Sequence, residues 1–166
     1  ENQNPHDLPK VRGYNIINGR LKSSSDGSTF LSVNPANLSD EVGEFPLSTR
    51  EDVHDAIAAA REALASWSST PAPTRGQIIG NMGRLLMEHK EDLVRLQARE
   101  IGKTVKECGG EIQEAIDTCL FFQSEGRRLY GQTVNSELPD KELFTYRRPL
   151  GAVSYTHLRA HETSRN

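Results

Sequence analysis

The stretch from Thr74 to Gln123, TRGQIIGNMGRLLMEHKEDLVRLQAREIGKTVKECGGEIQEAIDTCLFFQ, decides the fold of this chain. Apolar residues recur in it at steps of three and four, which predicts helices with one apolar side each. A helix begins near Thr74, and its expected inward residues are Ile78, Ile79, Met82, Leu85 and Leu86. The polar run EHKED at 88–92 predicts a break or a solvated face. The pattern then continues through Leu93, Val94, Leu96 and Ile101 to Gly102, which is placed just past the helix end.

Another helix begins at Thr104, because Thr104 and Glu107 have the spacing of a capping box. Its apolar side is predicted to consist of Val105, Cys108, Ile112, Ile116, Cys119 and Leu120. Gly109 and Gly110 lie inside this helix, where each glycine costs about 1 kcal/mol relative to alanine. A close backbone contact at these glycines would account for that cost.

Both cysteines of the chain, Cys108 and Cys119, fall on this helix. Eleven residues at roughly 100° each bring them back to nearly the same face, about 16 Å apart along the axis. That separation is too large for a disulfide bond. We expect reduced thiols that face a core, as in a cytoplasmic protein.

An earlier helix is predicted from a capping box at Ser48 and Glu51. Its apolar stripe is Val53, Ile57, Ala60, Leu64 and Trp67, and the run SSTPAPT at 68–74 ends it.

Strands are predicted on both sides of the helices. In YNIINGRL at 14–21, the Asn18-Gly19 pair predicts a hairpin with a type I′ turn. FLSVNPAN at 30–37 reads as a strand that ends at Asn34-Pro35, with DEVGEFPL at 40–47 as its partner. After Gly131, QTVNSEL at 132–138 and LFTYRRPLGAV at 143–153 are also predicted to be strands.

Composition excludes several classes of function. The chain has 166 residues, about one domain, and a formal net charge of -3 with mixed signs. That balance gives no electrostatic indication of nucleic acid or of an anionic membrane as a partner. No run approaches the roughly 18 apolar residues of a membrane-spanning helix. The polar start ENQNPHDLPK does not have the pattern of a signal peptide.

Candidate chemistry in the sequence is sparse. Gly76, Gly80 and Gly83 lie within a helical pattern, which indicates helix packing or a chance spacing and not a phosphate-binding loop. The carboxylates of Glu111, Glu114 and Asp117 are expected on one exposed side of a helix, and the sequence shows no pocket in which they could do acid–base work. The pairs Arg127-Arg128 and Arg147-Arg148 are expected on solvated faces or in local salt bridges.

A metal site in the last thirteen residues is the remaining chemical hypothesis. His157 and His161 have helical spacing and Glu162 follows them. No third ligand is evident and few apolar residues would hold the segment in place, so an unstructured tail is preferred. We assign no residue to a metal site.

Taken together, these pieces resemble the N-terminal part of the aldehyde dehydrogenase superfamily. The matching stretches follow the family's order across residues 14–153: IINGRL, SVNPAN, DVHDAIAAAREALASW, RGQIIGNMGRLLMEHKEDLVRLQAREIGKTVKE, GEIQEAIDTCLFF, YGQTV and YRRPLGAV. The region 124–153 looks most like bacterial enzymes that oxidise α-ketoglutarate semialdehyde or succinate semialdehyde. The resemblance implies an α/β fold, with an incomplete Rossmann-like cofactor domain that has an N-terminal β-hairpin and several helices. Residues 1–13 would be a flexible arm.

The resemblance also implies a chemistry, a cofactor and partners. In this family a cysteine thiolate attacks the aldehyde, hydride passes to NAD or NADP, and water activated by a glutamate hydrolyses the thioester. The substrate is a small aldehyde, the enzymes are usually homo-oligomers, and the location would be cytoplasmic. The family's catalytic and dinucleotide-binding segments follow the match to PLGAV. No catalytic, cofactor-binding or metal-binding residue is therefore assigned to any position of this chain.

After Val153 the family pattern stops. Residues 154–166, SYTHLRAHETSRN, resemble a peptide produced when sequencing-adapter DNA is translated, so we expect a foreign tail. Because the family's nucleophile and phosphate-binding turn are missing, we expect the chain to have no dehydrogenase activity. We also expect it to fold poorly alone, because its helices lack the sheet on which they would pack. The alternative is a non-enzymatic truncated module that docks onto a full-length dehydrogenase subunit.

Overall fold

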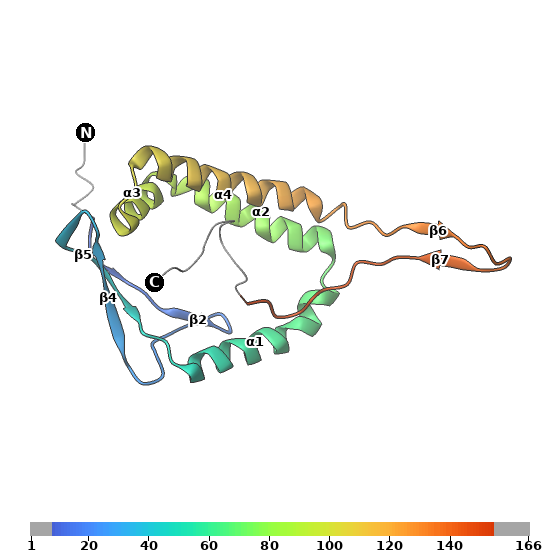
Figure 1. The fold of residues 1–166 in the computed structure, drawn as a ribbon, viewed down its shortest axis with the longest axis horizontal. Coiled ribbons are helices and arrows are strands. Elements are labelled where there is room, and N and C mark those ends of the chain that lie inside the picture. The colour runs from blue at the N-terminus through green and yellow to red at the C-terminus, as the bar shows by residue number, and fades with distance from the viewer. Residues whose placement is uncertain (1–7, 155–166) are drawn as a thin grey trace.

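The computed structural model describes residues 8–154 of the chain. The helices are α1 (Arg50–Ser69), α2 (Ala72–Glu88), α3 (Lys90–Ile101) and α4 (Val105–Glu125). The strands are β1 (Val11–Arg12), β2 (Asn15–Ile17), β3 (Arg20–Lys22), β4 (Thr29–Asn34), β5 (Asn37–Pro46), β6 (Thr133–Asn135) and β7 (Glu142–Phe144). Figure 1 shows α2, α3 and α4 packed together, with α1 lying apart from them and the long strands at one end.

Helices α2 and α4 pack side by side through glycines. Gly76, Gly80 and Gly83 are the buried residues of α2. A Cβ atom on Gly76 would lie 2.6 Å from the backbone oxygen of Gln123 in α4, and one on Gly83 would lie 2.8 Å from the Cβ of Cys119. Because glycine has no Cβ atom, the two helices approach more closely than they could with any other residue at these positions. The prediction that these three glycines serve helix packing is confirmed.

The same packing corrects the predicted inward face of α2. Ile78, Met82 and Leu85 are exposed, while Ile79 and Leu86 are partly buried. The helix turns its glycines toward α4, and this rotates part of the apolar stripe away from the contact. The predicted start at Thr74 is also two residues late, because α2 begins at Ala72 with proline in its first turn.

Helix α3 joins this group to the sheet. His89 separates α2 from α3, at the polar run where the sequence predicted a break, and Gly102 ends α3 with φ +69°. From α3, the buried guanidinium of Arg99 contacts Asp40 of β5 at 2.6 Å. Arg99 also donates to the backbone oxygens of Leu8 and Glu41. A single buried ion pair thus connects α3, β5 and the start of the described chain.

The predicted apolar side of α4 is buried at Cys108, Ile116 and Cys119 but is wrong at its two ends, where Val105 and Leu120 are exposed. Thr104 and Glu107 form the predicted capping box, in which each side chain bonds the other residue's backbone N–H. Cys108 and Ile116 are fully buried, and Cys119 is buried beside them. Both cysteines are free thiols, as predicted. Open space surrounds the Cβ positions of Gly109 and Gly110 in the described part of the chain, so the close contact expected there is absent.

The longer strands form a small mixed sheet. β4 and β5 are antiparallel, as predicted, and β1 is parallel to β5 on its other side. Residues 11 and 12, placed in the flexible arm from sequence, are therefore strand, because β5 offers them an open edge. β2 and β3 form the predicted hairpin, with φ +52° at Asn18 and +69° at Gly19.

Helix α1 begins with a capping box one residue later than predicted. Thr49 and Asp52 form it, since Asp52 Oδ2 accepts from the Thr49 backbone N–H at 2.7 Å. Ser48 instead donates its hydroxyl to Asn15. The apolar stripe of α1 remains accessible: Val53 is 52% exposed and Trp67 42% exposed. Asp52 is the only buried residue of this helix.

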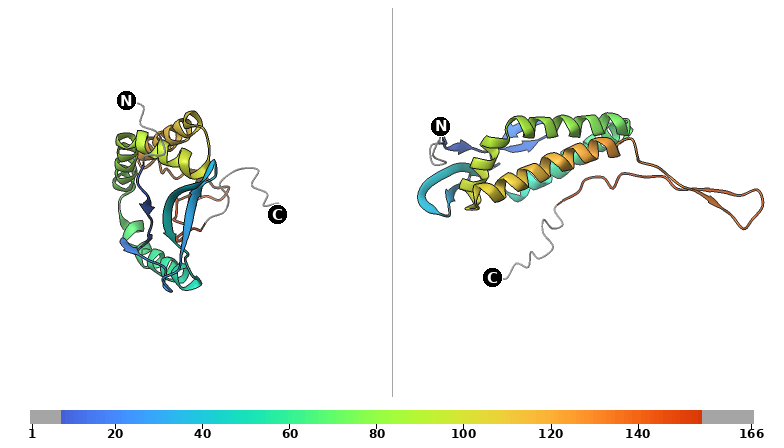
Figure 2. Two further views of the ribbon diagram at one scale, coloured as in Figure 1. Left: turned by 90° about the vertical axis from the view of Figure 1, so that its left-hand side faces the viewer. Right: turned by 90° about the horizontal axis from the view of Figure 1, so that it is seen from above.

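The last described strands form a separate hairpin. β6 and β7 pair antiparallel and project beyond the helices in both views that show them from the side (Figures 1 and 2). The strand predicted over 143–153 is wrong beyond Phe144. Residues 145–154 are irregular: Thr145 still donates its backbone N–H to Gln132, but the ladder does not continue and Pro149 has no N–H to donate.

Candidate functional site

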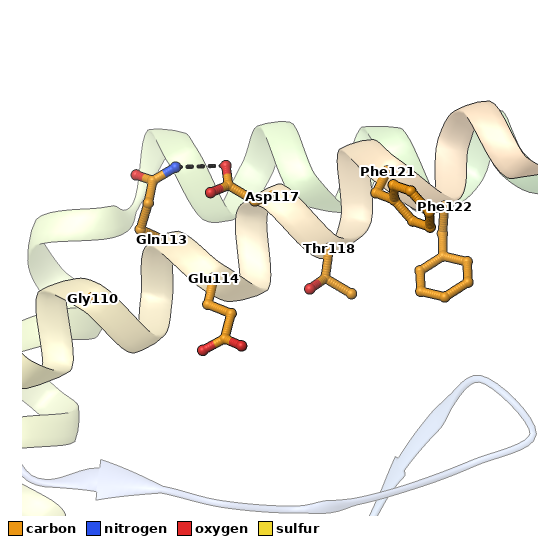
Figure 3. A pocket seen from close by; sticks show the side chains of 7 residues that line it. All are labelled: Gly110, Gln113, Glu114, Asp117, Thr118, Phe121 and Phe122. Atoms are coloured by element: carbon orange, nitrogen blue, oxygen red, sulfur yellow. Dashed lines mark hydrogen bonds between the residues drawn. The ribbon is translucent and has the colours of Figure 1, made fainter.

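A shallow cavity lies on the outer face of α4, and we call it the α4 groove. Its volume is about 480 Å³. The residues that line it are Gly110, Gln113, Glu114, Asp117, Thr118, Phe121 and Phe122. All belong to one helix, so its turns set their spacing, and Figure 3 shows Gln113 and Asp117 on one edge of the helix and Glu114, Thr118 and Phe122 on the other.

The α4 groove has a polar end and an aromatic end. At the polar end, Gln113 donates its side-chain amide to Asp117 at 2.8 Å (Figure 3). At the other end, the rings of Phe121 and Phe122 meet edge to face, with centroids 5.3 Å apart. Nearer the start of α4, Gly110 has no side chain, and in the described chain no atom of another element lies within 4 Å of where its Cβ would be. The groove can therefore accept the surface of another segment or molecule.

A second cavity, the interhelix cavity, lies between the end of α1, the start of α2 and the end of α4. Its volume is about 580 Å³. Trp67, Ile79, Met82 and Phe122 give it apolar walls, and three arginines, Arg75, Arg128 and Arg147, contribute to its lining. The guanidinium of Arg75 lies over the ring of Trp67, 6.0 Å from its centroid. The sequence did not indicate this cavity, because it joins residues from distant parts of the chain.

Both cysteines are buried in α4. Cys108 is fully buried, and burial together with the nearby carboxylate of Glu111 raises the pKa of its thiol. A raised pKa keeps the thiol protonated and unreactive. Cys119 is buried between α4 and α2 beside Gly83. Both therefore belong to the packing of α4, as the sequence predicted.

The carboxylates predicted on one exposed side of α4 separate into two groups. Glu114 and Asp117 are exposed and line the α4 groove. Glu111 is partly buried, forms an ion pair with Lys103, and accepts from Gln97 at 2.6 Å. The prediction is therefore wrong for Glu111, because the end of α3 and the loop after it cover its side of the helix.

The other candidates are placed as follows. Arg128 forms the expected local salt bridge, with Glu125 at 2.7 Å, and Arg127 and both residues of the Arg147-Arg148 pair are exposed. His157, His161 and Glu162 lie outside the described residues. Within residues 8–154, no group of three or more potential ligand side chains could hold a metal ion.

The three glycines of α2 do not form a phosphate-binding loop. A phosphate-binding loop needs glycines whose backbone faces the ligand, whereas Gly76, Gly80 and Gly83 face α4 at contact distance. The sequence signal that could have pointed to the α4 groove is the Gly109-Gly110 pair. Two glycines weaken a helix, and no close packing contact in the described chain explains why they are there. Across the described part of the chain, none of the helices is both long enough and apolar enough to cross a membrane.

Comparisons with known proteins agree with this fold. The model of the aldehyde dehydrogenase family matches residues 21–156. Succinate-semialdehyde dehydrogenase [NADP(+)] from Escherichia coli is 36% identical over 149 residues, which cover 90% of this chain and 31% of that enzyme. An alpha-ketoglutarate semialdehyde dehydrogenase from Haloferax volcanii is 35% identical over 84% of this chain and 29% of its own length.

Solved structures give the same result. An NADP-dependent enzyme from E. coli has a TM-score of 0.76 at 37% identity, over 80% of this chain and 27% of that chain. An NAD-dependent aldehyde dehydrogenase from Sinorhizobium meliloti has a TM-score of 0.78 at 27% identity, over 85% of this chain and 28% of that chain. This chain thus spans about a third of the length of its curated relatives. The predicted α/β fold, part of an aldehyde dehydrogenase fold, is confirmed, and the chain belongs to the aldehyde dehydrogenase family.

Proposed function

We propose that this chain is part of an NAD(P)-dependent dehydrogenase that oxidises a semialdehyde to the carboxylic acid. The observation that carries the proposal is the 36% identity to the E. coli succinate-semialdehyde enzyme along 90% of the chain. Semialdehyde enzymes of three kinds, for succinate, α-ketoglutarate and malonate semialdehyde, are among its relatives.

The catalytic chemistry belongs to the part of a subunit outside this chain. A cysteine thioester, hydride transfer to the nicotinamide and a glutamate-activated water would be supplied there, by analogy with the family. The described residues contribute the scaffold: α2, α3 and α4 pack on one another, and Arg99 fixes them to the sheet. We therefore expect the 166-residue chain to reduce neither NAD nor NADP with any aldehyde. Reduction above the blank by the purified chain would overturn this expectation.

A chimera tests the proposal directly. Residues 8–153 replace the matched region of the E. coli enzyme, so the junction follows Val153, where we place the end of the dehydrogenase part. We expect reduction of NADP with succinate semialdehyde, because the scaffold would support the E. coli catalytic residues. The matched control carries Ile116→Asp, which places a charge in the fully buried centre of α4 and should abolish activity. A soluble but inactive chimera would contradict the proposal.

A second candidate is a non-enzymatic module that docks onto an intact dehydrogenase subunit. The exposure of Val53, Ile57 and Trp67 along α1 favours it, since such a stripe is normally covered. We expect a tagged chain of this kind to co-purify with an intact dehydrogenase and to lose the partner on Val53→Lys. If the chain is recovered without any dehydrogenase, the docking module is contradicted and the first proposal remains.

A further inference from the structure

Two turns near the start of the described chain each place a glycine directly after a residue with a side-chain carbonyl. Asn18 precedes Gly19 in the turn between β2 and β3, and Asp26 precedes Gly27 in the loop before β4. These are the one Asn-Gly pair and the one Asp-Gly pair of the sequence. In such pairs the backbone nitrogen of the glycine can attack the preceding side-chain carbonyl carbon, because no Cβ shields that nitrogen.

The Asn18-Gly19 turn is unrestrained. Both residues are exposed, and open space surrounds the Cβ position of Gly19. Among residues 8–154, neither the Asn18 side chain nor the Gly19 backbone N–H has a hydrogen-bond partner. The sheet that carries this turn has only two strands, and its Ile16 and Leu21 are 73% and 66% exposed. A hairpin that buries so little opens readily, and the glycine nitrogen can then reach the asparagine side chain.

The Asp26-Gly27 loop is restrained at both reacting groups. The Asp26 carboxylate accepts from the Ser24 hydroxyl at 2.7 Å and from the Ser28 backbone N–H at 2.8 Å. The Gly27 N–H, whose nitrogen would attack, instead donates to the Ser24 backbone oxygen at 3.0 Å. The bond from the Ser24 hydroxyl, followed by that from Ser28, lowers the pKa of Asp26, and an ionised carboxylate resists attack by a nitrogen. The fold thus protects this pair and leaves the other open.

We propose that Asn18 is a site of spontaneous deamidation in this chain, and that the fold confines the reaction to the β2–β3 turn by protecting Asp26. The Gly19 nitrogen gives up its proton and bonds to Cγ of Asn18, the bond from Cγ to Nδ2 breaks, and ammonia leaves with the proton. Water then opens the succinimide ring at either carbonyl, which gives aspartate or isoaspartate. The sum is hydrolysis of one amide, so water is the only co-reactant.

The two products affect the hairpin differently. Aspartate keeps the turn, because it tolerates a positive φ such as the +52° of Asn18. Isoaspartate adds a methylene group to the backbone, which the two-residue turn between Ile17 and Arg20 cannot accommodate without a change of register. We therefore expect isoaspartate, and not aspartate, to unpair β2 from β3.

Ageing of the 166-residue chain in warm neutral buffer, followed by tryptic peptide mapping, tests the inference. Trypsin releases the peptide 13–20, which contains both Asn15 and Asn18. Asn15 is the internal control, because the branched side chain of Ile16 follows it and shields the attacking nitrogen. We expect Asn18 to convert at least tenfold faster than Asn15. Mass spectrometry detects the conversion, and retention time separates aspartate from isoaspartate.

Ageing in guanidinium chloride removes the fold and tests the protection of Asp26. We expect isoaspartate at Asp26 to form at least tenfold faster in denaturant than in buffer, whereas conversion of Asn18 changes less than threefold. Ser24→Ala removes one donor to Asp26 and should allow isoaspartate to form there in buffer as well. Ser23→Ala, at the exposed neighbouring serine, is the matched control and should leave both rates unchanged.

The measurements can overturn each part of the proposal. An Asn18 that keeps its amide in buffer but loses it in denaturant would show that the turn protects it. Equal rates at Asp26 with and without denaturant would contradict the role given to the hydrogen bonds of its loop. If amides 14–22 exchange equally slowly in fresh chain and in chain rich in isoaspartate, β2 and β3 stay paired. None of these readouts depends on dehydrogenase activity, so they stand apart from the proposed function.

Discussion

Helices α1 and α4 have nearly equal length and similar sequence signals, yet their surroundings differ completely. Each starts with a capping box and has an apolar stripe at helical spacing. In α4 that stripe buries Cys108 and Ile116 fully, whereas in α1 only the polar Asp52 is buried. An apolar stripe in the sequence therefore predicts which face of a helix is suited to burial, but it does not identify the element that packs against that face.

The two helices are also held by different forces. Helix α4 contacts α2 through glycines and α3 through side chains, so burial and close packing hold it. Helix α1 is held at its first turn, where Asp52 accepts from the Ser25 and Thr49 backbone N–H groups at 3.0 and 2.7 Å. We therefore expect changes around α4 to affect the whole fold and changes on α1 to act locally.

The largest expected effect comes from breaking the buried ion pair of α3. Arg99→Ala would leave the carboxylate of Asp40 buried without its cation, while both side chains are now less than a tenth exposed. Removal of one partner from such a pair costs about 3–5 kcal/mol in the free energy of unfolding. Urea unfolding followed by circular dichroism measures this. A variant that unfolds at the same urea concentration as the wild type would show that the pair does not join α3 to the sheet.

Closing the gap between α2 and α4 should have the next largest effect. In Gly76→Ala the new methyl group would meet the backbone oxygen of Gln123, which cannot move without shifting α4. Overpacking of this kind costs about 1–3 kcal/mol. The same urea titration measures it, and an unchanged midpoint would mean that the two helices are less closely packed than the structure indicates.

The matched control on α4 should change stability in the opposite direction. Gly109→Ala adds a methyl group where nothing lies within 4 Å, so only the gain in helix propensity remains. That gain is about 0.5–1 kcal/mol. A loss of stability in the 166-residue chain would instead reveal a contact over Gly109.

Acid should loosen α1 at its first turn. The hydrogen bond from the Thr49 backbone, with further bonds from Ser25, lowers the pKa of Asp52 below its usual value. The stabilisation of the ionised carboxylate is therefore present above the unfolded-state pKa and is lost as pH falls through the lower folded-state pKa. Trp67 is the only tryptophan and lies on α1, so its fluorescence follows this helix. We expect Asp52→Asn to remove the acid transition, and an identical transition in that variant would assign it to another group.

The smallest effect is expected on the exposed stripe of α1. Val53→Ser changes a side chain that is 52% exposed, and surface substitutions of this kind stay within about 0.5 kcal/mol. Ile116→Ser at a fully buried position of α4 is the contrasting variant and should be severely destabilised. Similar losses in both would mean that α1 is packed as tightly as α4.

The sequence predicted local structure better than contacts. The Asn18-Gly19 turn, the Thr104 capping box and the glycine end of α3 at Gly102 all follow from backbone preferences of a few neighbouring residues. The sequence predicts the first capping box one residue early, because Ser48-Glu51 and Thr49-Asp52 have the same spacing. Only the bonds from Ser25 to Asp52 and Thr49 select the second pair. The strand over 145–153 was wrong, because a strand depends on a partner that local pattern does not reveal.

The cavities could not be predicted from the sequence for the same reason. The interhelix cavity joins Trp67, Arg75 and Arg147, which only the fold brings together. The α4 groove lies on one helix, and its single local signal was the unexplained cost of Gly109 and Gly110. Membership of the family, by contrast, was recognisable because many short stretches occur in one order.

Hydrogen exchange of the 166-residue chain tests the contrast between α1 and α4 most directly. The amides of 108–119 in α4 should exchange at least tenfold more slowly than those of 56–66 in α1, because α4 is packed on two helices and most of α1 is not. Equal protection of the two helices would contradict the account, since α1 would then have a partner within this chain.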